Sequence, residues 1–336
     1  MKRRKAVVTF KKMWVTAVLL SFCSLFNQWA SAQSTSQSFP NRPIRFVVPF
    51  GPGTSSDLQA RFIAQRLTKL SGQPIIIDNR PGANGLIAMQ YVLSQPADGY
   101  TLAVGGTTTH AGNVSLFKSL PYDPIKDFVG ISGLGVGGGA IIVRPGFAAK
   151  NIGELIALAG QNPGKYSYAS GAAFARVAIE TLAHTSGISL LHVPYKGGAS
   201  TAVEVMAGTV DLAFEPLVTL IPLINSGKVR VLGVSTQKRI PGLDDIPTVA
   251  EQGLPSYRAV GWLALFAAVN TPPDIVTQLN SLIVSILKTQ EANDFFRQNA
   301  MWETMPMSSV ELGAFVKAEI EPVSYTHLTL PTKRIV

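Results

Sequence analysis

From Pro40 onward, two kinds of apolar pattern alternate along the chain. Short apolar or β-branched runs predict strands at 44–50, 74–78 and 100–104. The segments between them have a helical period; Ile63, Leu67 and Leu70, for example, share one face of a helix predicted over 56–70. A second helix is predicted over 85–95. Strands that alternate with helices favour an α/β fold with a mostly parallel sheet.

The same alternation resumes in the middle of the chain. It predicts helices near 151–160 and at 174–186, 199–207 and 217–226, and strands at 166–169, 188–192, 210–214 and 229–235. Two extended runs, one glycine-rich at 130–146 and one apolar at 261–270, bracket this section. We therefore expect two lobes joined by two crossover strands, with lobe 1 formed by 33–139 and 259–321 and lobe 2, formed by 140–258, inserted in it.

The N-terminus has the features of a secretory signal. A basic head precedes the apolar run 13–26, and Ala30-Ser31-Ala32 supplies small residues for cleavage after about Ala32. Fourteen apolar residues are short for a membrane span, although a retained anchor and lipidation at Cys23 are alternatives. Cys23 is the only cysteine of the chain, so the mature protein would have no thiol chemistry. We expect a periplasmic protein.

The far C-terminus has a different character. Residues 322–336 ("PVSYTHLTLPTKRIV") have no helical period, unlike the helix expected just before them. We interpret 322–336 as a non-native tail and leave it out of the predicted fold.

The formal net charge of +9 does not indicate a nucleic-acid partner. Six cations lie at the extreme N-terminus and two lie in the C-terminal tail, which leaves 29 − 6 − 2 = 21 cations against 20 anions. The remaining charge of +1 is too small for a basic binding surface.

A turn of glycine and proline follows the first predicted strand and is a candidate anion-binding site. Gly51-Pro52-Gly53 leads through Thr54-Ser55-Ser56, any of which can cap the next helix. A second strand-to-helix turn contains Gly82 and Gly85. Both helix ends would direct partial positive charge at one cleft.

The same loop has a rival interpretation as a dinucleotide site, with Asp78 as the acid that binds the ribose. Ser56 stands where that motif requires its third glycine. An exported nicotinamide-dependent oxidoreductase is therefore kept as an alternative.

Catalytic and metal-binding motifs give no support for an enzyme. The sequence contains no G-x-S-x-G and no H-E-x-x-H. His184 falls in a predicted helix and His192 in an apolar strand, where structural roles are expected. We predict no catalytic residues, no metal and no cofactor.

Ten stretches, in order between 39 and 321, together resemble the Bug family, the extracytoplasmic solute receptors of tripartite tricarboxylate transporters. They are "PNRPIRFVVPFGPGTSSD", "DNRPGANGLIA", "PADGYTL", "LPYDPIKDF", "NPGKYSYAS", "HVPYKGG", "AGTVDLAF", "SGKVRVLGVSTQKR", "IPTVAEQGLP" and "TPPDIV". The resemblance implies a two-lobed type II periplasmic-binding-protein fold that closes on a small carboxylate. It also implies a monomer that delivers its ligand to integral-membrane transporter subunits.

The resemblance implies a set of ligand-binding residues in both lobes. They are Phe50, Gly51, Gly53, Thr54, Ser55, Asp57, Gly82, Ala83, Asn84, Gly85, Thr108 and His110 from lobe 1, and Ser170, Gly171, Arg176, Tyr195, Asp211 and Phe214 from lobe 2. For Phe50, packing in the core is the alternative to packing on the ligand. Asp57 and Asp211 would more naturally fix loops by accepting backbone N–H bonds than touch an anion.

Two departures from the family pattern affect this site. Thr54 stands where the family often has glycine, so the loop geometry could differ. The family commonly has Gly-x-Gly-Ser-x-x-His in lobe 2, where this chain has "GAAFAR" at 171–176. Arg176 would either donate two parallel hydrogen bonds to a second carboxylate or lie on the helix surface as a solvated cation. Phe174 would favour a less polar acid, for example an aromatic one.

The combined prediction is a periplasmic solute-binding protein, not an enzyme. Its ligand would be a small carboxylate: a di- or tricarboxylate, an amino acid or an aromatic acid. A module that senses a ligand for a signalling partner is the second alternative, beside the oxidoreductase.

Overall fold

The computed structural model describes residues 39–195, 201–240, 242–298 and 303–329. The signal sequence predicted at 1–32 and residues 330–336 of the predicted tail lie outside these ranges. The described residues 39–41, which include a cis Phe39–Pro40 peptide bond, belong to a separate unit. Residues 42–336 form one compact unit, and the following account concerns that unit.

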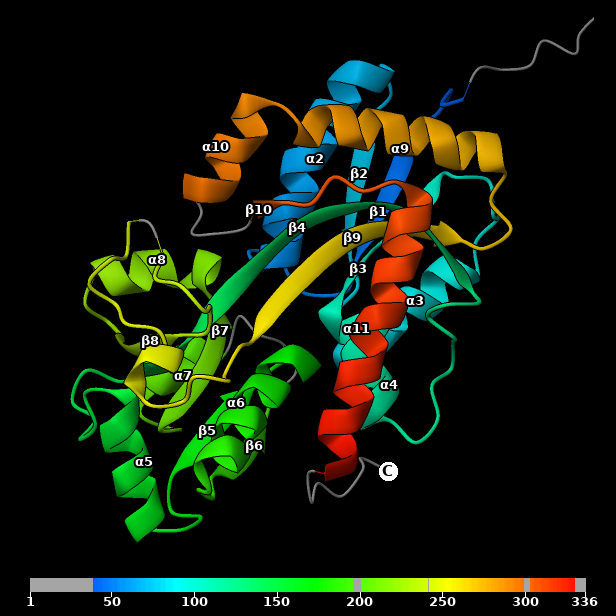
Figure 1. Cartoon of the computed structure of the whole chain (residues 1–336). Helices are drawn as coiled ribbons and strands as arrows, with labels where there is room; N and C mark the ends of the chain where they lie inside the picture. Colours follow the sequence, from blue (N-terminus) through cyan, green and yellow to red (C-terminus); the bar gives the residue numbers. More distant parts are fainter. Residues whose placement is uncertain (1–38, 196–200, 241, 299–302, 330–336) are drawn as a thin grey trace, which may run out of the picture. The chain divides into compact units, whose positions relative to one another are not determined.

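One curled sheet of ten strands organises this unit (Figure 1). Its order is β2 (Ile75–Asn79), β1 (Ile44–Val48), β3 (Thr101–Gly106), β9 (Val260–Ala268), β4 (Phe128–Val143), β7 (Leu212–Pro216), β5 (Ser167–Ser170) and β6 (Leu191–Pro194), with β8 (Arg230–Val234) and β10 (Glu303–Thr304) also paired to β4. The α/β class predicted from the sequence is confirmed. The expectation of a mostly parallel sheet is wrong, because β4 and β9 run antiparallel to their neighbours.

The strands β4 and β9 are the two extended runs predicted from the sequence. β4 pairs with β9 from Phe128 to Gly138, and from Gly139 onward it pairs with β7. It therefore belongs first to the group β1, β2, β3, β9 and β10, the first lobe, and then to the group β5–β8, the second lobe (Figure 1). The fold is two-lobed, as predicted, while the residue limits given above for each lobe stay a prediction.

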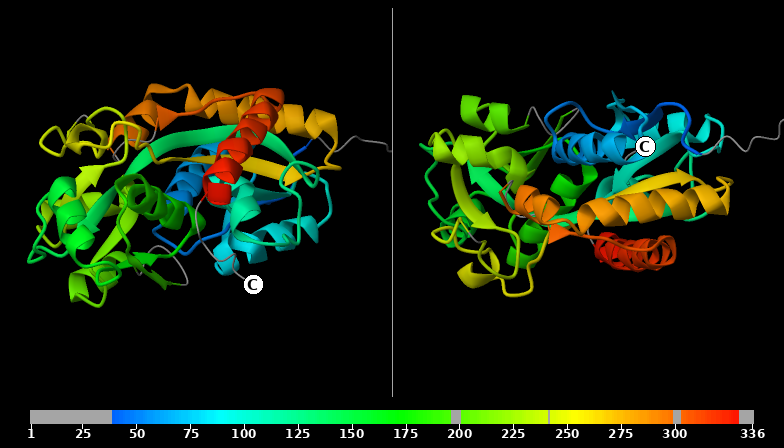
Figure 2. Two further views of the ribbon diagram at one scale, coloured as in Figure 1. Left: turned by 60° about the horizontal axis from the view of Figure 1, so that its bottom comes forward. Right: turned by 90° about the horizontal axis from the view of Figure 1, so that it is seen from above.

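Helices flank both groups of strands. The first lobe has α2 (Ser55–Ser71), η1 (Ala83–Gly85), α3 (Leu86–Leu93), η2 (Thr107–Gly112), α4 (Asn113–Leu116), α9 (Pro273–Leu287), α10 (Gln290–Gln298) and α11 (Ser309–Thr329). The second has α5 (Ile152–Gln161), α6 (Ala173–Ser186), α7 (Thr201–Ala207), α8 (Leu217–Asn225) and η4 (Ala250–Gln252). α9 packs against α2 and α11, and Figure 2 shows it between them when the molecule is seen from above.

The second lobe buries both faces of its sheet. Along β4, Ile141 and Val143 enter one apolar cluster, and Ala140 and Ile142 enter another. Successive side chains of a strand point to opposite faces, so this run is apolar at every position rather than at alternate ones.

Several boundaries differ from the sequence prediction, two of them at helix ends. The strand expected at 188–192 begins only at Leu191. The residues just before it close the end of α6 in a Schellman motif, in which Gly187 N–H donates to His184 O and Ile188 N–H donates to Ala183 O. In the predicted tail, 322–329 continue α11 as helix. Each residue that extends an existing helix adds one backbone hydrogen bond, so a helix can continue through a segment that has no clear apolar period.

Candidate functional site

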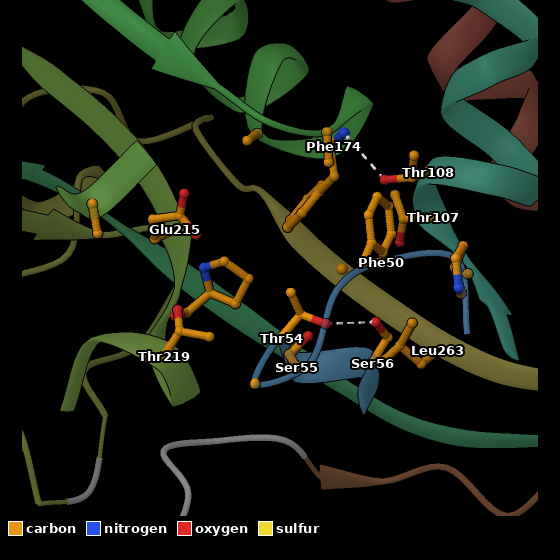
Figure 3. A pocket seen from close by; sticks show the side chains of 18 of the residues that line it. Phe50, Thr54, Ser55, Ser56, Thr107, Thr108, Phe174, Glu215, Thr219 and Leu263 are labelled. Carbon is orange, nitrogen blue, oxygen red and sulfur yellow. Dashed lines mark hydrogen bonds between the residues drawn. The ribbon is translucent and has the colours of Figure 1, made fainter. Parts of the chain in front are cut away.

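A cavity of about 290 Å³ has walls from both lobes (Figure 3). The first lobe supplies the loop after β1, the end of β3 with the start of η2, and the start of β9. The second lobe supplies the start of α6, residues of α7, and the joint between β7 and α8. At roughly 30 Å³ for one water, the cavity has room for a small organic molecule.

The first lobe places hydroxyl groups and a helix N-terminus at the cavity. We call Thr54, Ser55, Ser56, Thr107 and Thr108, which all line it, the hydroxyl side. The first backbone bond of α2 runs from Leu58 N–H to Thr54 O. Within the described residues, no partner accepts from the backbone N–H groups of Ser55, Ser56 or Asp57. These N–H groups and the helix dipole favour an anion at this end.

Asp57 holds the loop in front of α2 in place. It is 2 % exposed, and its Oδ2 accepts from Gly53 N–H and from Arg61 Nε, both at 2.9 Å, while Oδ1 accepts from Asn79 Nδ2 at 3.0 Å. Burial raises the pKa of Asp57, but the bonds from Arg61, Gly53 and Asn79 outweigh it, so the pKa lies below its ordinary value. The geometry is that of a loop-fixing carboxylate and not of a ligand contact.

Thr54 fits this loop without glycine. Its φ of −74° and ψ of 162° are open to any residue, and its Oγ1 donates to Gly51 O at 2.8 Å. Gly53, in contrast, has φ +79°, which favours glycine. Gly51 itself does not line the cavity, whereas Phe50 does. The departure at Thr54 therefore leaves the turn intact and adds a hydroxyl to the cavity.

The π-helical turn η2 provides one of the contacts between the lobes among the described residues. Thr108 Oγ1 accepts from Phe174 N–H in α6 at 3.4 Å (Figure 3). Thr107 Oγ1 accepts from Trp262 N–H at 2.8 Å, which fixes η2 to the start of β9. The predicted site residue His110 is fully buried, stacks on Phe266 at 3.8 Å and does not line the cavity. Burial lowers the pKa of His110 to about 3, so this side chain is neutral.

The second glycine turn lies behind the cavity rather than in its wall. Gly82, Ala83, Asn84 and Gly85 are absent from the lining. A Cβ on Gly85 would lie 2.7 Å from Thr109 Cγ2 and 2.9 Å from Pro49 Cβ. The Asn84 carbonyl accepts from Asn113 Nδ2 at 3.1 Å. This turn therefore supports the residues that line the cavity, and a direct ligand contact from it stays a prediction.

The second lobe contributes an apolar wall: Phe174, Ala175, Val203, Met206 and Leu223. The Phe174 ring meets the edge of Phe214 at 5.2 Å and an interplanar angle of 89°. Phe214, a predicted site residue, is fully buried behind Phe174 and does not reach the cavity. The apolar character that the sequence suggested for Phe174 is thus shared by its neighbours.

The other site residues predicted in the second lobe do not line the cavity. Ser170 Oγ lies 2.7 Å from His192 Nε2, next to the buried Gly171, and the Ser170 carbonyl accepts from Tyr195 N–H. Asp211 Oδ2 accepts from Ser167 N–H at 2.8 Å, so it fixes a loop, which is the role expected for it above.

Arg176 is not the solvated helix cation of one suggested role, and its contact with a ligand carboxylate stays a prediction. Its side chain is 13 % exposed and its Nε lies 3.7 Å from Glu180 Oε1, so it is not a solvated cation. It also does not line the cavity, so this geometry gives no support to a fork onto a second carboxylate there.

Sequence reasoning missed Glu215, which follows the strand segment 210–214. Glu215 lines the cavity and is 4 % exposed, and Thr201 Oγ1 donates to its Oε1. Burial raises the pKa of Glu215 well above its ordinary value. The sequence feature that could have identified Glu215 was its place at the end of an apolar strand, where α/β folds bind ligands. Thr219, Trp262 and Leu263 were also missed.

Other kinds of site find little support in the described residues. They contain no group of three or more His, Cys, Asp or Glu side chains placed to hold a metal ion. No helix among them combines the length and apolar character needed to cross a bilayer. Asp78, the acid of the dinucleotide interpretation, pairs with Arg45 at 3.1 Å and Arg80 at 2.9 Å and is not in the cavity wall.

Comparison with known proteins identifies relatives with a similar sequence and fold. Protein BugT of Bordetella pertussis is 31 % identical over 269 residues, which are 79 % of this chain and 82 % of BugT. Rpa4515 of R. palustris, solved with adipate, has a TM-score of 0.83 and 34 % identity over 86 % of this chain and 98 % of its own. MatC from Rhodopseudomonas palustris, solved with bound malate, has a TM-score of 0.81 and 29 % identity over 86 % and 100 %.

The family profile named TctC, the tripartite tricarboxylate transporter family receptor, matches residues 59–324. This match begins within α2, after Ser55 and Ser56, and includes η2, α6, α7, β7 and β9, which supply much of the rest of the cavity wall. The chain therefore belongs to the receptor family of tripartite tricarboxylate transporters.

Proposed function

We propose that this protein captures a small organic acid in the periplasm and delivers it to integral-membrane transporter subunits. The observation that carries the proposal is the start of α2, where Ser55 and Ser56 line a cavity of about 290 Å³ and have unpaired backbone N–H groups. The adipate and the malate with which two relatives were solved support the choice of a carboxylate. Membership of a receptor family and the predicted signal sequence support export.

Neutral groups would hold the carboxylate. None of the described residues that line the cavity is Lys, Arg or His. Each direct hydrogen bond to a charged group contributes roughly 1.5–3 kcal/mol. Several such bonds from backbone N–H groups and hydroxyls, less the cost of ordering the ligand, are enough for capture of a dilute solute.

Closure of the two lobes would follow from the composition of the cavity. The hydroxyl side comes from the first lobe and the apolar wall from the second. A ligand that contacts both walls favours the state in which they lie together. Opening of that state would then release the ligand at the transporter.

A substitution that removes one backbone N–H tests the proposal directly. Ser55 is the first residue of α2, where proline is tolerated. Thr54 before it is already in the extended conformation that a following proline requires. We expect Ser55→Pro to weaken carboxylate binding at least tenfold in calorimetry with mono-, di- and tricarboxylates and aromatic acids.

Ser55→Ala is the matched control, because it removes the hydroxyl and keeps the N–H. It should lose less affinity than Ser55→Pro. Equal losses in the two variants, or no binding of any acid by the unaltered protein, would contradict the proposal.

A further inference from the structure

Two phenylalanine rings line the cavity, one from each lobe. Phe50 lies in the loop between β1 and α2, and Phe174 lies in the first turn of α6. Both side chains are half-buried, and the close view of the pocket in Figure 3 shows their rings above Thr54 and Ser55. The cavity therefore has an aromatic surface in each of the two lobes that form it.

The ring of Phe174 is held on several sides. It meets the Phe214 ring at 5.2 Å and an interplanar angle of 89°. It also lies against the backbone of Gly261 in β9, where an added Cβ would be 2.9 Å from Phe174 Cε1. The Phe174 N–H donates to Thr108 Oγ1 at 3.4 Å. A ring that is already held in place loses little freedom when a ligand packs on it, so this contact costs little entropy.

The loop that carries Phe50 also carries the groups expected to hold the carboxylate. Asn79 Nδ2 donates to Phe50 O at 2.9 Å and to Asp57 Oδ1 at 3.0 Å, which fixes the loop to the start of α2. Among the described residues, no aromatic ring is paired with that of Phe50. A ligand whose carboxylate lies at Ser55 would therefore have the atoms next to that carboxylate near an aromatic ring without a partner.

Both an aliphatic chain and a flat ring can pack against phenylalanine. Aromatic pairs gain an attraction beyond the burial of apolar area, because the ring edge carries partial positive charge and the face partial negative charge. A ring close to its carboxylate also has few torsions to fix on binding, whereas a straight chain loses freedom at every bond. Two phenylalanine rings in one cavity thus favour an aromatic ligand.

We propose, on the basis of the function proposed above, that Phe50 and Phe174 select acids that carry an aromatic ring close to the carboxylate, and that the lobes close with this ring packed against both side chains. Phe174 and the N-terminus of α2 belong to different lobes. The ring contact therefore adds to the free energy that favours the closed state.

Three pairs of acids test the proposal by calorimetry: benzoate with cyclohexanecarboxylate, phenylacetate with cyclohexylacetate, and 3-phenylpropionate with 3-cyclohexylpropionate. Within each pair the ring size and the distance to the carboxylate are matched, and the saturated ring is at least as apolar. Burial of apolar area alone therefore gives no preference for the aromatic member. In the pair that binds best, the aromatic acid should bind at least tenfold more tightly.

Phe174→Leu and Phe50→Leu each keep an apolar side chain and remove one ring, so each should reduce this ratio at least threefold. Because the two residues come from different lobes, Phe50→Leu also tests the proposal if Phe174→Leu does not fold. Phe147→Leu is the matched control: Phe147 is buried against Tyr166 in the second lobe, outside the cavity, so the ratio should change less than 1.5-fold.

Two results would overturn the inference while the proposed function stands. In one, the saturated acid of every pair binds as tightly as its aromatic partner, or the protein binds only carboxylates that have no ring. In the other, both leucine variants keep the full ratio. If no carboxylate of this set or of the wider panel binds, the proposed function and this inference both fail.

Discussion

Two buried carboxyl groups near the cavity have opposite surroundings. Asp57 receives hydrogen bonds from Gly53, Arg61 and Asn79, which stabilise its charged form. Glu215 receives one from Thr201 and lines the cavity in the lobe that also supplies the apolar wall. Burial acts on both, but at Asp57 the donors outweigh it. The same chemical group therefore holds a loop in one lobe and lines a binding wall in the other.

Glu215→Gln should become more stable relative to the unaltered protein as the pH rises. The folded state keeps a proton on Glu215 above its ordinary pKa of 4.5, where the unfolded state has lost it. The native protein then binds more protons than the unfolded one, so its stability falls as pH rises, by up to about 1.4 kcal/mol per pH unit. Urea unfolding of both proteins from pH 4 to 8 measures this difference.

Asp57→Asn serves as the control of opposite sign. The pKa of Asp57 is lowered on folding, so its contribution is present above its ordinary value of 3.8 and is lost as pH falls below it. The variant should be less stable at neutral pH by about 1–3 kcal/mol, and the deficit should shrink below pH 4. A parallel response of the two variants to pH would contradict both assignments.

At the scale of elements, β4 connects the lobes by pairing with β9 and then with β7, and its glycines let neighbouring side chains approach closely. A Cβ on Gly139 would lie 2.4 Å from the Phe214 ring and 2.6 Å from Glu215 O. Gly139 N–H also donates to Ser235 Oγ at 2.9 Å. The point where β4 passes from β9 to β7 is thus packed against the strand that carries Glu215.

Gly139→Ala should lower the free energy of unfolding by about 1–3 kcal/mol, because the extra methyl group overpacks this junction. Gly146, just after β4, is the control: its nearest neighbour is the flexible Arg144 Nη1 at 3.4 Å from the added Cβ. Gly146→Ala should stay within about 0.5 kcal/mol of the unaltered protein. Equal urea midpoints for the two variants would show that the junction tolerates a side chain.

At the scale of the whole molecule, the lobes touch beside the cavity. The start of α6 meets η2 through the bond from Phe174 to Thr108. A Cβ on Gly112 would lie 3.3 Å from Ala173 Cβ, close to the separation that a disulfide needs. Neither Gly112 nor Ala173 lines the cavity, so a cross-link there would restrain the lobes without filling the site.

We expect the double variant Gly112→Cys/Ala173→Cys to form a cross-link on mild oxidation. If ligand entry requires the lobes to separate, the oxidised, empty protein should bind a carboxylate at least tenfold more slowly in stopped-flow measurements. Reduction should restore the rate, and each single variant should bind at the normal rate in either condition. Unchanged association after oxidation would mean that the cavity is reached without lobe separation.

Much of this architecture could be predicted from local sequence. The order of strands and helices followed from apolar periodicity, and the turn at Gly53 and the two long extended runs followed from glycine and apolar composition. Phe50, Gly53, Thr54, Ser55 and Thr108 were predicted for the site and do line the cavity, although ligand binding by them stays a prediction.

The sequence by itself determined the elements, because periodicity and turn chemistry act over a few residues. Only the tertiary structure decided that Gly85 supports Pro49, that Arg176 pairs with Glu180 away from the cavity, and that Glu215 enters it. Such outcomes depend on segments far apart in the chain, as with Thr108 and Phe174, 66 residues apart. Burial and partners set the role of a polar side chain, and both arise when those segments pack together.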